Sequence, residues 1–183
     1  MKYMVIDVES VGLHGEGFAV GYVVIDDGGK EYDAGWWATD PVYARGTALG
    51  LKWVRENVPD MTYEVHNTYT LRARFWERWQ HWKGEGALLA ADCAWPVEAR
   101  FLAACVDDQP SVREWQGPYP LVDVASIRLA AGFDPLGNYP RLPDEPQHHP
   151  LGDAKQSARL LMVALAKLRG ESREPVETGV SRV

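Results

Sequence analysis

A chain of 183 residues is long enough for one domain with a sizeable core and short for two. Its net charge of −7 argues against a protein that holds nucleic acid by bulk electrostatics, yet does not exclude chemistry on phosphates through bound metal ions. No apolar run reaches the ~20 residues that span a bilayer, and no signal segment is evident, so we expect no membrane partner and a cytoplasmic protein. Two cysteines, Cys93 and Cys105, exclude a disulfide framework and lack zinc-site spacing.

The first strand is expected from Tyr3 to Glu9, where an apolar, β-branched run ends in two acids. Residues i and i+2 of a strand point to the same side, so Asp7 and Glu9 should project together from its end. Two adjacent carboxylates repel each other, and a hard divalent cation between them would relieve that repulsion. The pair therefore indicates a metal site, unless both acids are simply solvated in a turn.

An antiparallel meander should follow. Residues 17–26 form an expected strand, Asp27-Gly28-Gly29 is a hairpin signal, and residues 30–37 form a third strand. Trp36 and Trp37 lie side by side on that strand, which is expected at the edge of the sheet. Neighbouring strand residues face opposite ways, so one of the two rings should leave the core, and we expect a contact such as a homodimer there.

Helices and strands then alternate. Helical spacing predicts a helix over residues 47–57, with Leu49, Trp53 and Val54 on its apolar face. A second amphipathic helix over residues 68–83 has an aromatic stripe, which we interpret as core rather than as a base-stacking surface. The further elements expected are a buried strand at 87–92, a helix beginning at Pro96, a strand at 120–124, a helix at 125–131 and a helix at 151–169.

The remaining segments are expected to be irregular. Residues 132–150 are rich in Pro and Gly and should form a long loop, and residues 170–183 should be a disordered tail. This leaves a single domain over residues 1–169. Antiparallel strands followed by alternating helices and strands predict an α/β fold, with a mixed sheet covered by helices on both faces.

Acids stand at the ends of three of these elements. Asp92 follows the buried strand, Asp153 lies in the first turn of the last helix, and Asp7 with Glu9 ends the first strand. His148 precedes Asp153 by five residues on the long loop. Four carboxylates that hold two divalent ions, with a histidine that takes a proton from water, suit the hydrolysis of a phosphodiester.

The order and local sequence of these residues resemble the DEDDh family of 3′→5′ exonucleases. Residues 7–13 look like the first motif of that family, Asp92 with residues 96–102 looks like the second, and His148-x4-Asp153 matches the third. The form of the second motif is similar to that of the short mycobacterial-type exoribonucleases. His66-Asn67 imitates an opening of the second motif found in proofreading subunits, but its acid would fall at Leu71, so we reject it.

The resemblance implies a ribonuclease H-like fold with a mixed five-stranded sheet, and Mg²⁺ or Mn²⁺ as the two metal ions. It implies that Asp7 bridges both ions, that Glu9 and Asp153 complete one of them, and that Asp92 holds the other. His148 would be the general base. Substrate contacts are expected at Ser10, Val11, Gly12, Leu13 and Glu98, although an exposed helix acid is the simpler interpretation of Glu98. Ser10 and Val11 replace the family's more usual threonines.

The sequence thus predicts a metal-dependent exonuclease that removes nucleoside 5′-monophosphates from the 3′ end of single-stranded nucleic acid. The resemblance modestly favours RNA, and a phage or repair type of DNA exonuclease is the alternative. A binding module without activity is less favoured, because all four acids and the histidine are present. An endonuclease or resolvase of related fold does not ordinarily place a histidine five residues before its last acid.

Overall fold

The computed structural model describes residues 1–171, and the part of the predicted tail from residue 172 onward lies outside them. Five strands form one sheet in the order β3-β2-β1-β4-β5. The first three strands are antiparallel, and β4 and β5 run parallel to β1, as the mixed-sheet prediction required. The bounds are Lys2–Ser10 for β1, Gly17–Asp26 for β2, Glu31–Ala38 for β3, Ala87–Ala91 for β4 and Leu121–Asp123 for β5.

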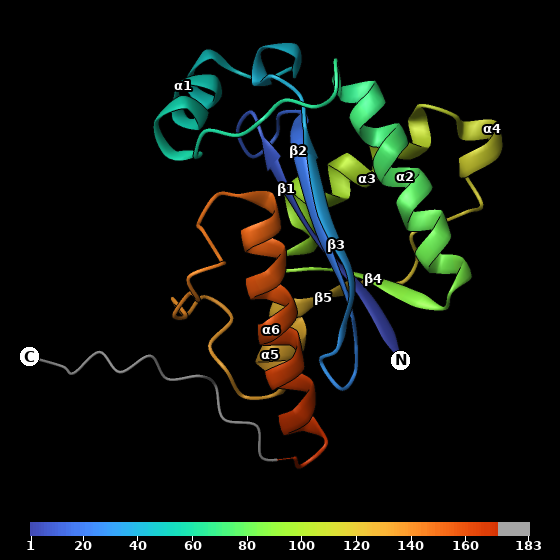
Figure 1. The fold of residues 1–183 in the computed structure, drawn as a ribbon, viewed down its shortest axis with the longest axis vertical. Coiled ribbons are helices and arrows are strands. Elements are labelled where there is room, and N and C mark those ends of the chain that lie inside the picture. Colours follow the sequence, from blue (N-terminus) through green and yellow to red (C-terminus); the bar gives the residue numbers. More distant parts are fainter. Residues whose placement is uncertain (172–183) are drawn as a thin grey trace, which may run out of the picture.

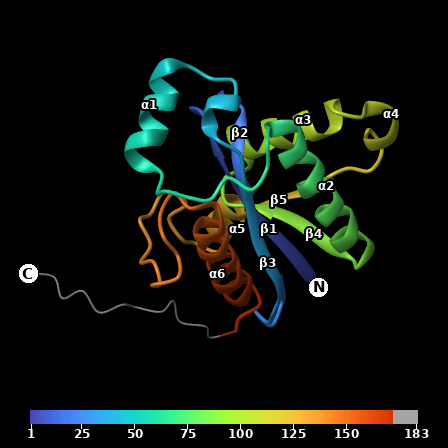
Figure 2. The same cartoon turned by 45° about the horizontal axis from the view of Figure 1, so that its top comes forward.

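Helices cover both faces of this sheet. In Figures 1 and 2, α2 and α3 lie on one side and α5 and α6 on the other, while α1 sits near the carboxyl end of β1. The bounds are Ala48–Asn57 for α1, Thr68–Gly84 for α2, Ala99–Asp107 for α3, Pro110–Arg113 for α4, Val124–Ala130 for α5 and Pro150–Leu168 for α6. Among the described residues, no helix has the length and apolar character to cross a membrane.

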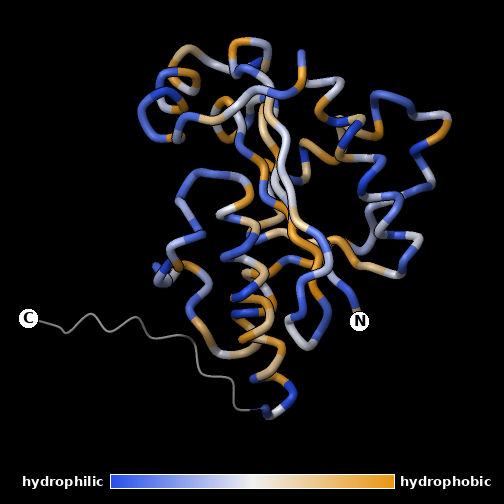
Figure 3. The backbone as a smooth tube through the Cα atoms, viewed as in Figure 1, coloured by the Kyte–Doolittle hydropathy of each residue, from blue (hydrophilic) through white to orange (hydrophobic). Residues whose placement is uncertain are grey.

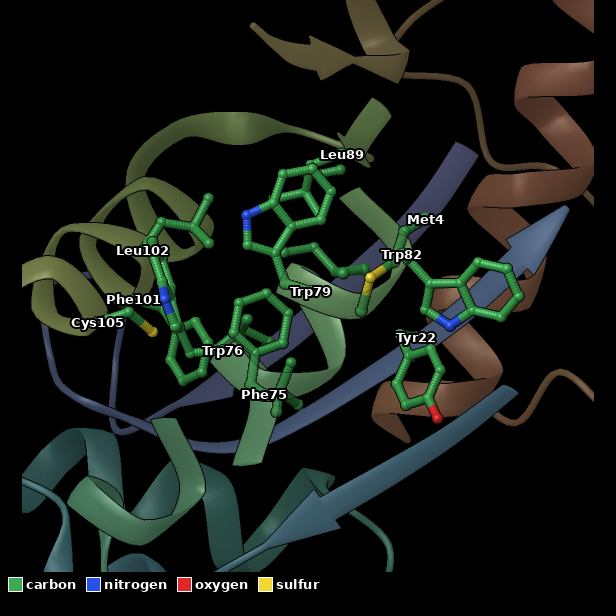
Figure 4. Close-up of a cluster of buried hydrophobic side chains, with 14 of the residues drawn as sticks. Met4, Tyr22, Phe75, Trp76, Trp79, Trp82, Leu89, Phe101, Leu102 and Cys105 are labelled. Atoms are coloured by element: carbon green, nitrogen blue, oxygen red, sulfur yellow. The ribbon is translucent and has the colours of Figure 1, made fainter. Parts of the chain in front are cut away.

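The alternation of side chains along β1 divides the core in two. Met4, Ile6 and Val8 face α2 and α3, where the aromatic stripe of α2 is buried as predicted (Figure 4). Tyr3 and Val5 face the other way, toward α6. Apolar residues are concentrated in the central strands and recur along the helices (Figure 3). Because side chains alternate, the next residues of the odd row, Asp7 and Glu9, also face α6.

Two local expectations were wrong. Leu49 and Trp53, expected on the apolar face of α1, are 79% and 43% exposed, and of the predicted three only Val54 is buried. The helix expected from Pro96 begins at Ala99. Residues 94–98 form a π-helical turn instead, in which Trp95 has extended backbone angles. Sequence periodicity did not distinguish this turn from the first turn of the helix.

Candidate active site

The acids at the end of β1 meet the start of α6. Glu9, His148 and Asp153 each place one potential ligand atom within 4.8 Å of the others, the one such group found among the described residues. Asp7 lies two residues before Glu9 on the same side of β1, and the charge of Asp153 acts on its carboxyl group more strongly than any other. The structure therefore brings together the first and third acidic segments and the histidine, residues separated by about 140 positions in the sequence.

A glycine opposite Asp7 permits this close approach. Gly21 of β2 pairs with Asp7 in the sheet. A Cβ atom at Gly21 would lie only 2.2 Å from the carbonyl carbon of Pro150, the first residue of α6. The backbone at the start of α6 thus rests directly on the sheet, and Asp153, in the first turn of that helix, is held close to the β1 acids.

We expect Gly21→Ala to lower the free energy of unfolding by about 1–3 kcal/mol, because the methyl group would force backbone atoms apart. The same displacement should move Asp153 away from Glu9 and weaken the binding of divalent ions. Thermal unfolding and Mn²⁺ titration measure the two effects. Gly84→Ala is a suitable control, since a Cβ at Gly84 meets no atom within 4 Å. An unchanged unfolding temperature for Gly21→Ala would contradict the close packing.

His148 is presented to the acids by an unusual backbone conformation. Its φ of 57° makes it the one non-glycine residue with positive φ in the described chain. Such conformations are uncommon outside glycine and concentrate at functional sites. Its ring contacts the Trp53 ring edge to face, with centroids 5.0 Å apart. Gly50, one turn before Trp53, rests against the backbone of Val11 and Gly12, which fixes α1 on the turn after β1.

The loop that carries His148 is anchored to α6. The buried carboxylate of Glu145 accepts hydrogen bonds from Nε and Nη2 of Arg159, at 2.8 and 2.6 Å. It also accepts a hydrogen bond from the Leu142 backbone amide. Arg141, on the same loop, forms an ion pair with Asp153 at 2.5 Å. The loop therefore contributes both the histidine and a positive charge to the site. Arg141 could not be identified from the sequence, because nothing in its local sequence indicates that it reaches Asp153.

Burial and mutual repulsion raise the pKa values of the clustered acids. Burial is the largest cause for Asp7, whose pKa lies well above its usual value, and Asp153, Glu9, Glu98 and Asp92 add to the rise in that order. Burial, Asp153 and Glu98 together raise the pKa of Glu9 to about 8, while Arg141 acts in the opposite direction. These carboxyl groups are thus held close together at a cost in stability when they ionise.

The metal-free protein should therefore lose stability as the pH rises. The ordinary pKa of glutamate, 4.5, applies to the unfolded chain, so between pH 4.5 and about 8 the folded state holds more protons at Glu9. Raising the pH through this range then favours unfolding. We expect the unfolding temperature in EDTA to fall from pH 5.5 to 8.5, with a smaller fall in Glu9→Gln. Saturating Mg²⁺ should reduce the fall in the unfolding temperature of the wild type still more. A flat profile in EDTA would contradict the clustered geometry.

Asp92 and Glu98 lie in different surroundings from those expected. Asp92 follows β4, but its side chain is 48% exposed, and its Oδ1 atom lies 3.9 Å from Nη1 of the buried Arg128. Glu98 is buried, with 8% of its surface exposed, so its interpretation as an exposed helix acid was wrong. Burial raises its pKa to about 7, backbone hydrogen bonds that include one from Val8 lower it, and Asp92 and Asp123 raise it further. Glu98 thus belongs to the acidic cluster.

The predicted substrate contacts after β1 differ in accessibility. Leu13 is 68% exposed, whereas the Val11 side chain is 3% exposed and packs in a core cluster with Ala38 and Val54. The Ser10 hydroxyl donates a hydrogen bond to the Gly12 carbonyl, and Gly12 has a φ of 82° that suits the turn. Of these residues, Leu13 offers a free side chain, and any contact from Val11 would have to come from its backbone.

The fold is similar to that of solved exonuclease structures. The chain is similar to E. coli Exonuclease I in complex with a dT13 oligonucleotide, with a TM-score of 0.62 and 14% identity over 92% of this chain and 41% of that chain. The same enzyme with a dA16 oligonucleotide gives a TM-score of 0.62 and 13% identity over 91% and 41% of the two chains. An ExoI/SSB-Ct complex gives 0.55 and 14% identity over 92% and 41%.

The sequence matches no protein-family model and no curated protein. The chain spans about two fifths of the length of the solved structures that it resembles. At this level of identity the similarity concerns the fold. The chain has the α/β exonuclease fold of the ribonuclease H-like type, with a mixed five-stranded sheet between helices.

Proposed function

We propose that this protein is a metal-dependent 3′→5′ exonuclease that hydrolyses single-stranded nucleic acid to nucleoside 5′-monophosphates. The observation that carries the proposal is the meeting of Glu9, Asp153 and His148 within 4.8 Å, beside Asp7, on an exonuclease-type fold. Acids from two segments and a histidine on a third are the groups that metal-assisted hydrolysis of a phosphodiester requires.

The residues present fit divalent cations. Five carboxylates lie in the cluster, those of Asp7, Glu9, Asp92, Glu98 and Asp153, and two of them are paired with arginines. No ion pair among the described residues includes Asp7, Glu9 or Glu98. Buried carboxylates without counter-ions are costly, and oxygen ligands of this kind suit Mg²⁺ and Mn²⁺. Two such ions, when bound, would neutralise the acids and the phosphate and lower the pKa of a coordinated water.

His148 is proposed as the general base. Its ring reaches Glu9 and Asp153, so it can take a proton from a water molecule held between these acids and the phosphate. The contact with Trp53 limits the rotation of the imidazole. The proton would pass to solvent, because His148 is only partly buried.

A surface for the terminal nucleotide lies beside His148, the proposed general base. Trp53 contacts His148 and is 43% exposed, and Leu13 is exposed on the turn against which α1 packs. Aromatic faces stack on unpaired bases without sequence preference. We propose that the 3′-terminal base contacts Trp53 and Leu13. The neighbouring Exonuclease I structures contain dT13 and dA16 oligonucleotides, which supports a single strand as the substrate class.

RNA is the finer proposal, and it rests on the resemblance of residues 92–102 to short exoribonucleases. DNA is the alternative, and it is supported by the oligodeoxynucleotides in the neighbouring structures. The test is hydrolysis of matched 5′-labelled RNA and DNA single strands, with Mg²⁺, Mn²⁺ or EDTA. A ladder that shortens from the 3′ end in the presence of metal supports the proposal, and the faster strand identifies the sugar. Cleavage of a circular substrate, or no cleavage of either strand, would overturn it.

A further inference from the structure

One carboxylate of the cluster has a position that the sequence analysis did not foresee. Glu98 lies at the end of the π-helical turn 94–98, directly before α3. It occupies the cap position of α3, yet its side chain makes no capping hydrogen bond. A carboxylate at a helix start ordinarily accepts a hydrogen bond from the first turn of its own helix. The side chain of Glu98 is directed elsewhere.

The Glu98 side chain is directed to the end of β1. The pairing of β1 with β4 ends at Ile6 and Ala91, because the chain leaves the sheet at Asp92. Beyond that point the Glu98 carboxylate accepts a hydrogen bond from the Val8 backbone amide, in addition to one from its own backbone amide. Glu98 thus lies beside β1 between Asp7 and Glu9, at the place that β4 would fill if it continued. Its burial, with 8% of its surface exposed, agrees with this position.

The effects of Glu98 on the pKa values of neighbouring acids support the same position. Glu98 raises the pKa of Asp7 more strongly than Asp92 does, and it acts on Glu9, where Asp92 is not among the principal causes. Interactions between charges weaken with distance and with exposure to water, so Glu98 is the more closely coupled of the two to Asp7 and Glu9, while Asp92 is coupled to Asp153. No basic side chain among the described residues pairs with it.

Asp92 has a different set of partners. Its Oδ1 atom faces the guanidinium group of Arg128, which is buried, donates to the Asp134 carbonyl and lies 4.0 Å from the centre of the Tyr139 ring. A buried guanidinium group needs a nearby negative charge. Asp92 supplies that charge, and it lines a cavity of about 250 Å³ with Arg128, Tyr139 and Arg141.

From these observations we propose that Glu98, rather than Asp92, supplies the fourth carboxylate ligand of the metal site, and that Asp92 is the counter-ion of Arg128. This inference rests on the proposed function of the site. A buried carboxylate without a cationic partner, directed at two further acids, is a ligand that a divalent ion would complete. The separation from Asp7 along the sequence is then 91 residues rather than 85.

The test compares two isosteric variants, Glu98→Gln and Asp92→Asn, by titration with Mn²⁺ and detection of the free ion by electron paramagnetic resonance. Loss of residues that merely support ligands costs about 10–100-fold in metal affinity, so Glu98→Gln should raise the Kd by at least about tenfold. Asp92→Asn should raise it clearly less. A larger loss of affinity in Asp92→Asn than in Glu98→Gln would overturn the proposal.

Thermal unfolding in EDTA at pH 8 gives a second, independent measurement. Glu98→Gln should unfold at a higher temperature than the wild type, since it removes a buried charge from a cluster of like charges. Asp92→Asn should gain less than Glu98→Gln, because Arg128 offsets part of the cost of burying the Asp92 charge. The opposite order would also overturn the proposal.

The failure of this inference is distinguishable from failure of the proposed function. Wild-type protein that neither binds Mn²⁺ nor shortens a 3′ end would count against the exonuclease itself. Wild-type protein that does both, with a Glu98→Gln variant that binds Mn²⁺ as well as the wild type, would reject only the role of Glu98.

Discussion

Asp7→Asn is expected to abolish 3′ shortening while it raises the unfolding temperature of the metal-free protein. Asp7 faces Glu9 and Asp153, and burial with the repulsion of four acids holds its pKa well above the ordinary value. The loss of a carboxylate proposed to hold the cations should exceed the ~10²–10⁴-fold effect of losing a positioned base. At pH 8 the neutral amide also relieves the repulsion, so the folded state gains stability.

Hydrolysis of a labelled single strand and thermal unfolding in EDTA measure the two effects. Asp60→Asn, which removes one charge from an exposed position, is the control and should alter neither strongly. With saturating Mg²⁺ the gain in unfolding temperature should disappear, because the variant binds the stabilising ion less well. A variant that is destabilised in EDTA would count against the packing of Asp7 among other acids.

His148→Ala is expected to slow turnover by about 10²–10⁴-fold and to leave the fold and most of the metal affinity intact. His148 reaches Glu9 and Asp153, but in the proposed site those two acids and their neighbours would hold the ions without it. Single-turnover hydrolysis and Mn²⁺ titration separate the two properties. Added imidazole should restore part of the rate, since it can fill the space left by the side chain.

The neighbouring histidine provides a matched control. His149 is the N-cap residue of α6 and contacts the ring of Trp36, with centroids 5.0 Å apart. Asparagine is a favoured N-cap residue, so His149→Asn should preserve the helix start and most of the activity. If His149→Asn lost activity as severely as His148→Ala, or if His148→Ala kept the wild-type rate, the assignment of the base would be wrong.

The sequence was sufficient to predict the sheet and the positions of some of the candidate site residues. Strand alternation placed Asp7 and Glu9 on one side, while Asp153 was expected in the first turn of the last helix and His148 on the loop before it. The structure brings Glu9, His148 and Asp153 together. These predictions succeeded because they depend on local periodicity and on element ends, which short stretches of sequence encode.

Glu98 and Arg141 could not be placed in the same way. Glu98 has the sequence context of an ordinary helix acid, and its burial depends on the π-helical turn before α3 and on the point where β4 leaves the sheet. Arg141 reaches Asp153 from a loop that Glu145 and Arg159 help to fix on α6. Both positions result from tertiary packing. Trp53 is similar, since helical spacing suggested core and the structure exposes it beside His148.

The homodimer contact and the cytoplasmic location stay predictions. Trp37 stacks on Tyr22, with ring centroids 5.4 Å apart, and Trp36 packs against a core cluster and against His149. Both rings thus have partners within this chain. Two adjacent tryptophans on the edge strand therefore give no separate reason to expect a second copy.

The anchor between Glu145 and Arg159 has a consequence for inactivation by heat. Residues 133–149 contain no helix or strand, so few backbone hydrogen bonds hold this segment, and side-chain contacts such as that of the Glu145 carboxylate with Arg159 attach it to α6. Segments of this kind open locally at a lower free energy than the whole domain needs to unfold. Opening would carry away His148 and Arg141 while the sheet and the acids of β1 stayed in place. Catalytic activity should then disappear at a lower temperature than the circular dichroism of the helices, and the protein should recover fully on cooling.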